Sequence, residues 1–131
     1  MKKMTEIYGN MSKGGKDMRF NLNDVIFDDD ITEGSDYTEI TGYMWATDIF
    51  CKIAGYNGEI GTDDYINLYP TYNVETGEFY VIASMVDGTK DTEEKLELTV
   101  SETDAIFNKF VEHYWGTKEN FNDFVNQWKE I

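Results

Sequence analysis

The sequence predicts an α+β fold: an antiparallel sheet of four or five strands over residues 18–100, followed by two C-terminal helices packed on one face of that sheet. Two observations predict it. β-branched and aromatic residues recur at alternate positions through much of the first hundred residues, which is the pattern of half-buried strands. From about residue 101 the apolar residues recur every three or four positions instead, as they do in amphipathic helices.

The chain is expected to form one domain, residues 18–131, after a loose N-terminal lead-in over residues 1–17. Its 131 residues are 40% hydrophobic and 15% aromatic, which suffices for one hydrophobic core. The lead-in mixes Lys, Gly, Ser and Asn without a sustained period. The high aromatic content argues against a disordered acidic chain.

The first two predicted strands lie in residues 18–27 and 37–58. In the first, Met18, Phe20 and Leu22 alternate with polar neighbours. In the second, six residues of one parity suggest period two: Tyr43, Trp45, Thr47, Ile49, Cys51 and Ile53. A helix over residues 44–54 remains an alternative for this region.

The clearest local signal is a hairpin whose loop is "ETG", residues 75–77. Two β-rich runs flank it, and Gly77 can take the positive φ that a short loop needs. Pro70 cannot donate a ladder hydrogen bond, so its strand is predicted to lie at an edge. The polar run "DGTKDTEE", residues 87–94, is expected to be a turn, and "KLELTV", residues 95–100, the last strand.

Two helices are expected to close the chain. Ser101 and Asp104 are spaced like a capping box, and the first helix should run to about Trp115 and end at Gly116. Thr117 is the expected N-cap of the second helix, whose apolar stripe is Phe121, Phe124, Val125, Trp128 and Ile131. The spacing predicts four buried aromatic side chains on these helices: Phe107, Phe110, Phe124 and Trp128.

The charge balance is strongly acidic and uneven. There are 26 Asp and Glu against 11 Lys and Arg, a formal net charge of −15. Residues 20–89 contain fourteen acidic residues and a single basic one, Lys52. This charge disfavours nucleic acid and anionic membranes as direct partners.

No catalytic signature is present, and we expect neither an enzyme nor a cofactor. His113 is the only histidine and Cys51 the only cysteine, and neither has a partner at a recognisable spacing. The segment "YNGEIGTDDY" follows its two glycines with acids that would repel phosphate. The single cysteine and the lack of an apolar leader or span indicate a cytoplasmic protein.

The stretch "DVIFDDDITEGSDYTEI", residues 24–40, holds seven carboxylates and no basic residue. Residues 28–39 partly match a calcium loop, but Gly34 stands one position too late and the flanks read as strands. A divalent-cation module in which Asp28, Asp30 and Glu39 hold the ion is therefore one alternative function. A solvated acidic loop without a ligand is another.

The preferred function is nucleic-acid mimicry by charge. A sheet domain that displays carboxylates on one side presents a field like that of a nucleic-acid backbone and can occupy a basic groove. The sequence thus predicts a non-enzymatic inhibitor that binds the basic surface of a nucleic-acid-handling protein, with an acidic adaptor of a mobile element as alternative. The predicted partner-binding residues are Asp28, Asp29, Asp30, Glu33, Asp36, Glu39, Asp63 and Asp64.

The C-terminal segment "VSETDAIFNKFVEHYWGTKENFNDFVNQW", residues 100–128, resembles the tail of the small acidic phage-encoded anti-CRISPR inhibitors of Cas9. The resemblance rests on "AIFNKF" and "ENFNDF" and covers under a quarter of the chain. It implies a compact α+β inhibitor, encoded by a phage, that uses acidic residues to block the site where Cas9 reads duplex DNA. It thus points to a CRISPR effector as partner, and it assigns no individual binding residue.

Overall fold

The computed structural model describes residues 18–29, 32–33, 38–58 and 62–129. They build a five-stranded sheet in the order β2-β3-β4-β5-β6, in which every neighbouring pair is antiparallel. The strands are β2 (Thr32–Glu33), β3 (Glu39–Thr41), β4 (Tyr65–Asn73), β5 (Phe79–Asp87) and β6 (Lys90–Lys95). The predicted lead-in, residues 1–17, lies outside the described residues, as do Asp30, Asp36 and Ile131.

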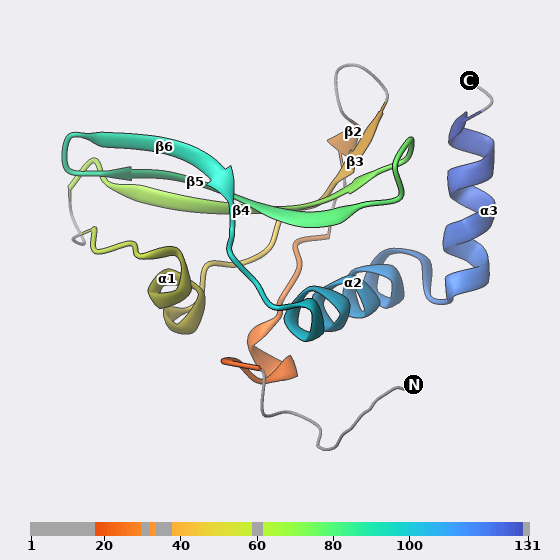
Figure 1. Ribbon diagram of the computed structural model, residues 1–131, viewed down its shortest axis with the longest axis horizontal. Coiled ribbons are helices and arrows are strands. Elements are labelled where there is room, and N and C mark those ends of the chain that lie inside the picture. The colour runs from red at the N-terminus through yellow and green to blue at the C-terminus, as the bar shows by residue number, and fades with distance from the viewer. Residues whose placement is uncertain (1–17, 30–31, 34–37, 59–61, 130–131) are drawn as a thin grey trace.

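Three α-helices accompany the sheet: α1 (Asp48–Ala54), α2 (Val100–Trp115) and α3 (Lys118–Lys129). Helices α1 and α2 lie beneath one face of the sheet, whereas α3 stands across one end of it (Figure 1). The α+β class, with an antiparallel sheet followed by two C-terminal helices, is confirmed.

The predicted hairpin is formed by β4 and β5, which pair from Tyr65↔Val86 to Tyr72↔Phe79. Its turn closes locally, because the side-chain Oδ1 of Asn73 accepts from the backbone N–H groups of Glu75 (2.9 Å) and Thr76 (3.0 Å). Gly77 takes a φ of 75°, which a residue with a Cβ rarely adopts.

The prediction that Pro70 marks an edge strand is wrong, because β4 lies between β3 and β5. Pro70 pairs with Val81 on one side, and on the other its carbonyl accepts from the N–H of Gly42 at 2.9 Å. The missing donor of Pro70 falls on that second side, where β3 has already ended at Thr41. The segment after β3 still follows β4, since the N–H of Met44 donates to the carbonyl of Leu68 at 2.9 Å, so the proline removes one donor from this side without ending the pairing.

The predicted first strand, residues 18–27, is wrong as well. This segment contains a 3-10 helix, Leu22–Asp24, in which the Asp24 carboxylate accepts from the N–H of Asn21 at 2.9 Å. Only Phe27 makes an isolated antiparallel bridge, to Met44. The local bonds of the polar residues outweigh the alternating pattern, although Phe20, Val25 and Phe27 are buried.

The strand predicted within residues 37–58 is confirmed only at β3, and residues 48–54 follow the helical alternative. Helix α1 ends at Gly55, which has a φ of 76°. Its apolar residues Ile49, Phe50, Ile53 and Ala54 share one helical face, and all four belong to or pack against the core. The period-two parity of this region is therefore a coincidence of composition.

The last strand lies at residues 90–95, not at 95–100, and the predicted turn shrinks to Gly88 and Thr89. A charged segment can serve as β6 because, among the described strands, β5 is its one neighbour, so that β6 forms an edge of the sheet. Val100 is 79% exposed and begins α2 instead of ending a strand.

Helix α2 begins two residues earlier than predicted. The capping box joins Thr99 and Glu102, where the Thr99 hydroxyl accepts from the N–H of Glu102 (3.1 Å) and Glu102 accepts from the N–H of Thr99 (2.9 Å). The predicted end at Gly116 is confirmed. For α3, the Thr117 hydroxyl accepts from the N–H of Asn120 at 3.1 Å, as an N-cap side chain does.

The core lies between the sheet and helices α1 and α2. The sheet contributes Ile40, Leu68, Val81 and Ala83, all 3% exposed or less. Of the four aromatic residues predicted to be buried, Phe110 and Trp128 are buried, whereas Phe107 and Phe124 are half-buried against the core.

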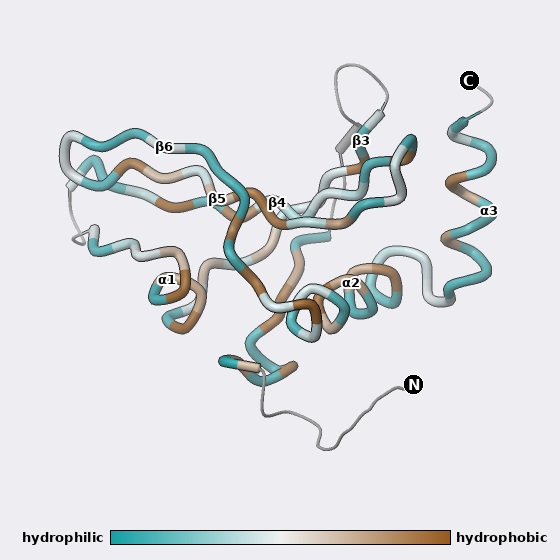
Figure 2. The backbone as a smooth tube through the Cα atoms, viewed as in Figure 1, coloured by the Kyte–Doolittle hydropathy of each residue, from teal (hydrophilic) through white to brown (hydrophobic). Residues whose placement is uncertain are grey.

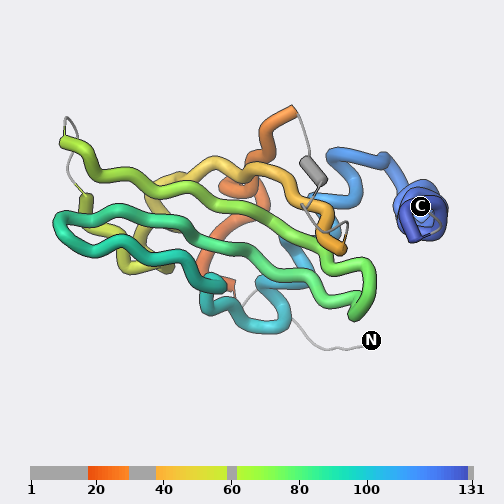
Figure 3. Tube along the Cα trace, turned by 90° about the horizontal axis from the view of Figure 1, so that it is seen from above, coloured from red at the N-terminus to blue at the C-terminus, as the bar shows by residue number. Residues whose placement is uncertain are grey.

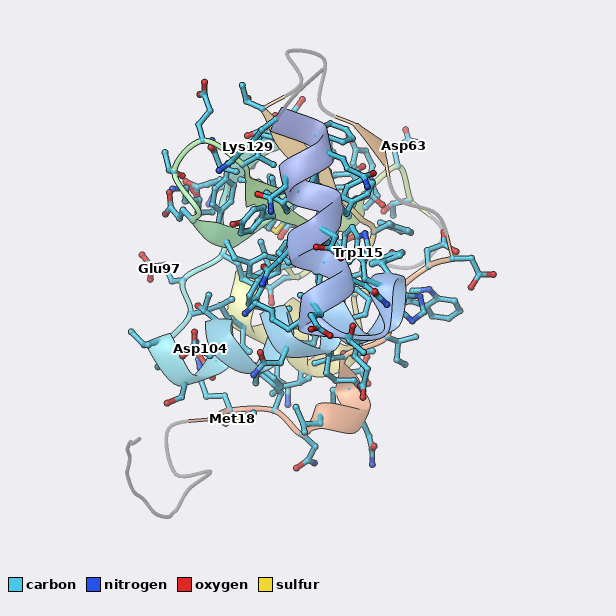
Figure 4. All side chains as sticks on the ribbon, turned by 90° about the vertical axis from the view of Figure 1, so that its right-hand side faces the viewer. Met18, Asp63, Glu97, Asp104, Trp115 and Lys129 are labelled. Carbon is cyan, nitrogen blue, oxygen red and sulfur yellow. The ribbon has the colours of Figure 1, made fainter. Side chains whose placement is uncertain are left out.

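Helix α3 joins this core through aromatic contacts at the end of the sheet. The Phe121 ring lies 4.9 Å from Tyr72 and 4.8 Å from Trp115, centroid to centroid. Figure 4 looks at this end, with α3 in front and Trp115 labelled beside it.

Candidate interaction surface

The face of the sheet turned away from α1 and α2 is not covered by any of the described helices or strands (Figure 3). Side chains alternate across a sheet, and Leu68, Val81 and Ala83 point to the helices. Their neighbours along the strands point the other way, and the register places residues of β6 beside them. We call this surface the open face; it consists of Glu39, Thr41, Tyr65, Asn67, Tyr69, Thr71, Tyr80, Ile82, Ser84, Val86, Asp91, Glu93 and Lys95, with Tyr43 beside Tyr69.

Tyrosines are prominent on the open face, and hydrogen bonds hold two of them in place. The Tyr43 hydroxyl donates to Oδ1 of Asn67 at 3.1 Å, and the rings of Tyr43 and Tyr69 lie 5.9 Å apart. The Tyr80 hydroxyl donates to Oε2 of Glu39 at 2.8 Å. Tyr65 is 46% exposed. Tyrosine offers a large, stiff contact area with a polar end, which suits an interface.

The charges of the open face are mostly negative. Glu39, Asp91 and Glu93 provide carboxylates, and β6 is largely hydrophilic in Figure 2. The one basic residue of the open face is Lys95, whose amino group lies 3.2 Å from the carboxylate of Glu78 and 4.4 Å from the centre of the Tyr80 ring. This arrangement is an intramolecular example of a cation held by a tyrosine and a carboxylate.

The elements beneath the sheet carry charges of both signs. Lys52 belongs to α1 and Lys109 to α2, and Arg19 is tied to α2 through Glu102. Helix α2 alone carries three acidic residues against one lysine, so both sides of the described molecule are acidic, and the open face is distinguished by its tyrosines and not by its net charge.

The predicted partner-binding residues do not gather in one place. Asp28, Asp29 and Glu39 lie near the β3 side of the sheet, since the N–H of Asp28 donates to the carbonyl of Tyr43 and Glu39 pairs with Asn73. Asp63 and Asp64 precede the opposite end of β4. A strand of nine residues spans about 25 Å at the usual rise, so Glu39 lies well beyond the Debye length of about 8 Å from Asp64. Asp28 lies between these two ends, since it lines one pocket with Ile66.

The other predicted residues do not join these carboxylates into one acidic patch among the described residues. Asp30 and Asp36 lie outside the described residues, and of Glu33 only the backbone, in β2, is described. Oδ1 of Asp64 accepts from the N–H of Gly88 at 2.9 Å and so ties the β5–β6 turn to the start of β4. The carboxylate of Asp64 therefore has a role in holding the fold together.

Sequence reasoning missed the part of the surface that β6 contributes. Asp91 and Glu93 stand in the segment expected to be a turn, although both face the same side as Tyr80 and Ile82 of β5. The available signal was the parity of β4, where Tyr65, Asn67, Tyr69 and Thr71 alternate with the apolar Ile66 and Leu68. Such an alternation predicts a polar, uncovered face.

A metal site and a catalytic site find no support in the described residues. Among these residues, no three His, Cys, Asp or Glu side chains gather in a way that could hold a metal ion. The set Asp28, Asp30 and Glu39 is not tested as a whole, because Asp30 lies outside them. Burial, followed by the charge of Asp48, raises the pKa of the Cys51 thiol, which disfavours the reactive thiolate.

None of the described helices has both the length and the hydropathy that a membrane span requires.

Comparisons with protein-family models, with curated proteins and with solved structures found no match. The resemblance of residues 100–128 to the anti-CRISPR inhibitors therefore stays a prediction.

Proposed function

We propose that the protein is a non-enzymatic inhibitor that binds the basic surface of a nucleic-acid-handling protein through its open face. The observation that carries this proposal is the combination of tyrosines and carboxylates on an uncovered sheet face, whose one lysine, Lys95, is paired with Glu78. Arginine and lysine side chains of a partner can lie over the tyrosine rings and pair with Glu39, Asp91 and Glu93.

The net charge of −15 adds a long-range attraction toward a basic groove and raises the association rate. The inhibition then follows from occupancy, since a groove filled by this domain is closed to nucleic acid. The resemblance noted above makes a CRISPR effector the first partner to try and a phage the expected source.

The test is capture of partners from a bacterial lysate at increasing salt. The variant Asp91→Lys/Glu93→Lys reverses two exposed carboxylates of the open face. The matched control, Glu112→Lys/Glu119→Lys, reverses two exposed carboxylates on α2 and α3. Both variants change the net charge by the same amount, so they differ only in the face that is altered.

Wild type and control are expected to retain the same nucleic-acid-binding proteins, whereas the open-face variant retains about tenfold less or none. Retention by the wild type should fall as salt screens the charges. Equal loss in both variants would mean that total charge and not the open face governs binding. Retained proteins that do not bind nucleic acid would contradict the proposed function itself.

A further inference from the structure

A pocket opens beside the rim of the open face, lined by Asp28, Tyr43, Trp45, Ala46, Thr47 and Ile66. Two backbone hydrogen bonds hold its walls together. The N–H of Asp28 donates to the carbonyl of Tyr43 (2.8 Å), and the N–H of Trp45 donates to the carbonyl of Ile26 (2.9 Å). Tyr43 also contacts Tyr69, so the pocket continues the open face.

Three features of this pocket suit a flat cation. Trp45 is 55% exposed, although an indole ring is among the side chains that gain most from being covered. The carboxylate of Asp28 is exposed, and its Oδ1 accepts from the N–H of Asp29 at 2.9 Å, which orients it. None of the six lining residues is basic.

A fourth feature is the hydroxyl of Thr47, which is buried without a hydrogen-bond partner among the described residues. Buried polar atoms are usually paired, and an unpaired one costs free energy. A ligand that brings N–H donors into the pocket would satisfy it.

Resting on the function proposed above, we propose that this pocket receives the guanidinium group of an arginine of the partner. The group would stack on the indole of Trp45 and pair with the carboxylate of Asp28. Guanidinium is flat, weakly hydrated and able to make two parallel hydrogen bonds to a carboxylate, whereas the ammonium of lysine is a compact, strongly hydrated point charge. The pocket thus selects arginine over lysine.

The test uses three small probes, the amides of L-arginine, L-lysine and L-citrulline, and follows the backbone amide NMR signals of Ala46, Thr47 and Ile66. Citrulline has nearly the shape of arginine but no charge. Arginine amide is expected to bind saturably and about tenfold more tightly than lysine amide, and citrulline amide should not saturate.

The variants Trp45→Ala and Asp28→Asn should each abolish saturable binding of arginine amide. Asp29→Asn is the matched control, because it removes the same charge from the adjacent exposed residue, and it should leave binding unchanged. Equal affinity for arginine and lysine amides, or equal effects of Asp28→Asn and Asp29→Asn, would overturn the inference. If arginine amide binds selectively but no nucleic-acid-binding protein is captured, the pocket stands and the proposed function fails. If nucleic-acid-binding proteins are captured but arginine amide does not bind selectively, the pocket assignment fails and the proposed function stands.

Discussion

Glu102→Gln is expected to lower the free energy of unfolding by about 3 kcal/mol at pH 7. The carboxylate of Glu102 is fully buried and accepts four hydrogen bonds. Three come from Arg19, from its backbone N–H (2.8 Å), Nε (2.9 Å) and Nη2 (2.7 Å), and one comes from the N–H of Thr99. These bonds join the start of the described chain to the first turn of α2. An amide keeps the shape but loses the charge and two acceptor sites.

The loss should depend on pH with a defined sign. Burial alone would raise the pKa of Glu102, but the hydrogen bonds from Arg19 and from the N–H of Thr99 outweigh it and lower the pKa from 4.5 to about 2. A lowered pKa means that the stabilisation is complete above about pH 4.5 and is lost as the pH falls toward 2.

Urea unfolding of wild type and Glu102→Gln from pH 7 down to pH 3 measures this effect as a difference, so that the other carboxylates cancel. The difference in free energy of unfolding between the two proteins should become smaller below about pH 4.5. Glu112→Gln, an exposed residue on the same helix, is the control and should differ from wild type by less than about 0.5 kcal/mol. A difference in stability that stays constant with pH would show that the loss comes from the missing acceptor sites and not from the charge of Glu102.

Phe110→Ala is expected to cost about 4 kcal/mol, because it opens a cavity at the centre of the aromatic core. Phe110 is fully buried. Its ring centroid lies within 6 Å of four others: Phe27 (5.9 Å), Phe79 (5.2 Å), Tyr114 (5.3 Å) and Trp115 (5.4 Å). One truncation therefore weakens the contacts among α2, β5 and the segment around Phe27.

Chemical denaturation measures this loss, with Phe124→Ala as the comparison. Phe124 is half-buried and touches only Trp115 and Trp128 among the described aromatic rings, so its truncation should cost clearly less. A loss below about 1 kcal/mol for Phe110→Ala would mean that this ring does not organise the core.

The elements that sequence reasoning predicted well are those whose signals are local. The β4–β5 hairpin depends on Gly77, and the end of α2 depends on Gly116, both of which take a positive φ. The apolar residues of α2 and α3 recur with a helical period, which can be read from the sequence whatever the helices pack against. In these places the residues that set the structure are neighbours in the sequence.

The errors occur where distant residues decide. Residues 18–27 leave the strand pattern partly through the local bond between Asn21 and Asp24 and partly because Arg19 is bound by Glu102, 83 positions away. Charged residues 90–95 form a strand because β5 offers a free edge, which no local pattern reveals. The same limit applies to the candidate surface. Counting acids along the chain groups Glu39 with Asp64, whereas the fold places them at opposite ends of β4. The fold also brings Asp91 and Glu93 beside Val86 and Ser84 of β5.

The most direct measurement of the open face is carboxylate footprinting of the protein alone and in complex with the captured partner. Accessible carboxylates are coupled to a neutral amine, and the extent of labelling at each residue is read by mass spectrometry. Binding through the open face predicts that Asp91 and Glu93 become protected, while Glu112, Glu119 and Asp123, which are equally exposed on α2 and α3, keep their labelling. Protection of the three helical carboxylates with unchanged labelling of Asp91 and Glu93 would place the partner on α2 and α3 and contradict the proposal.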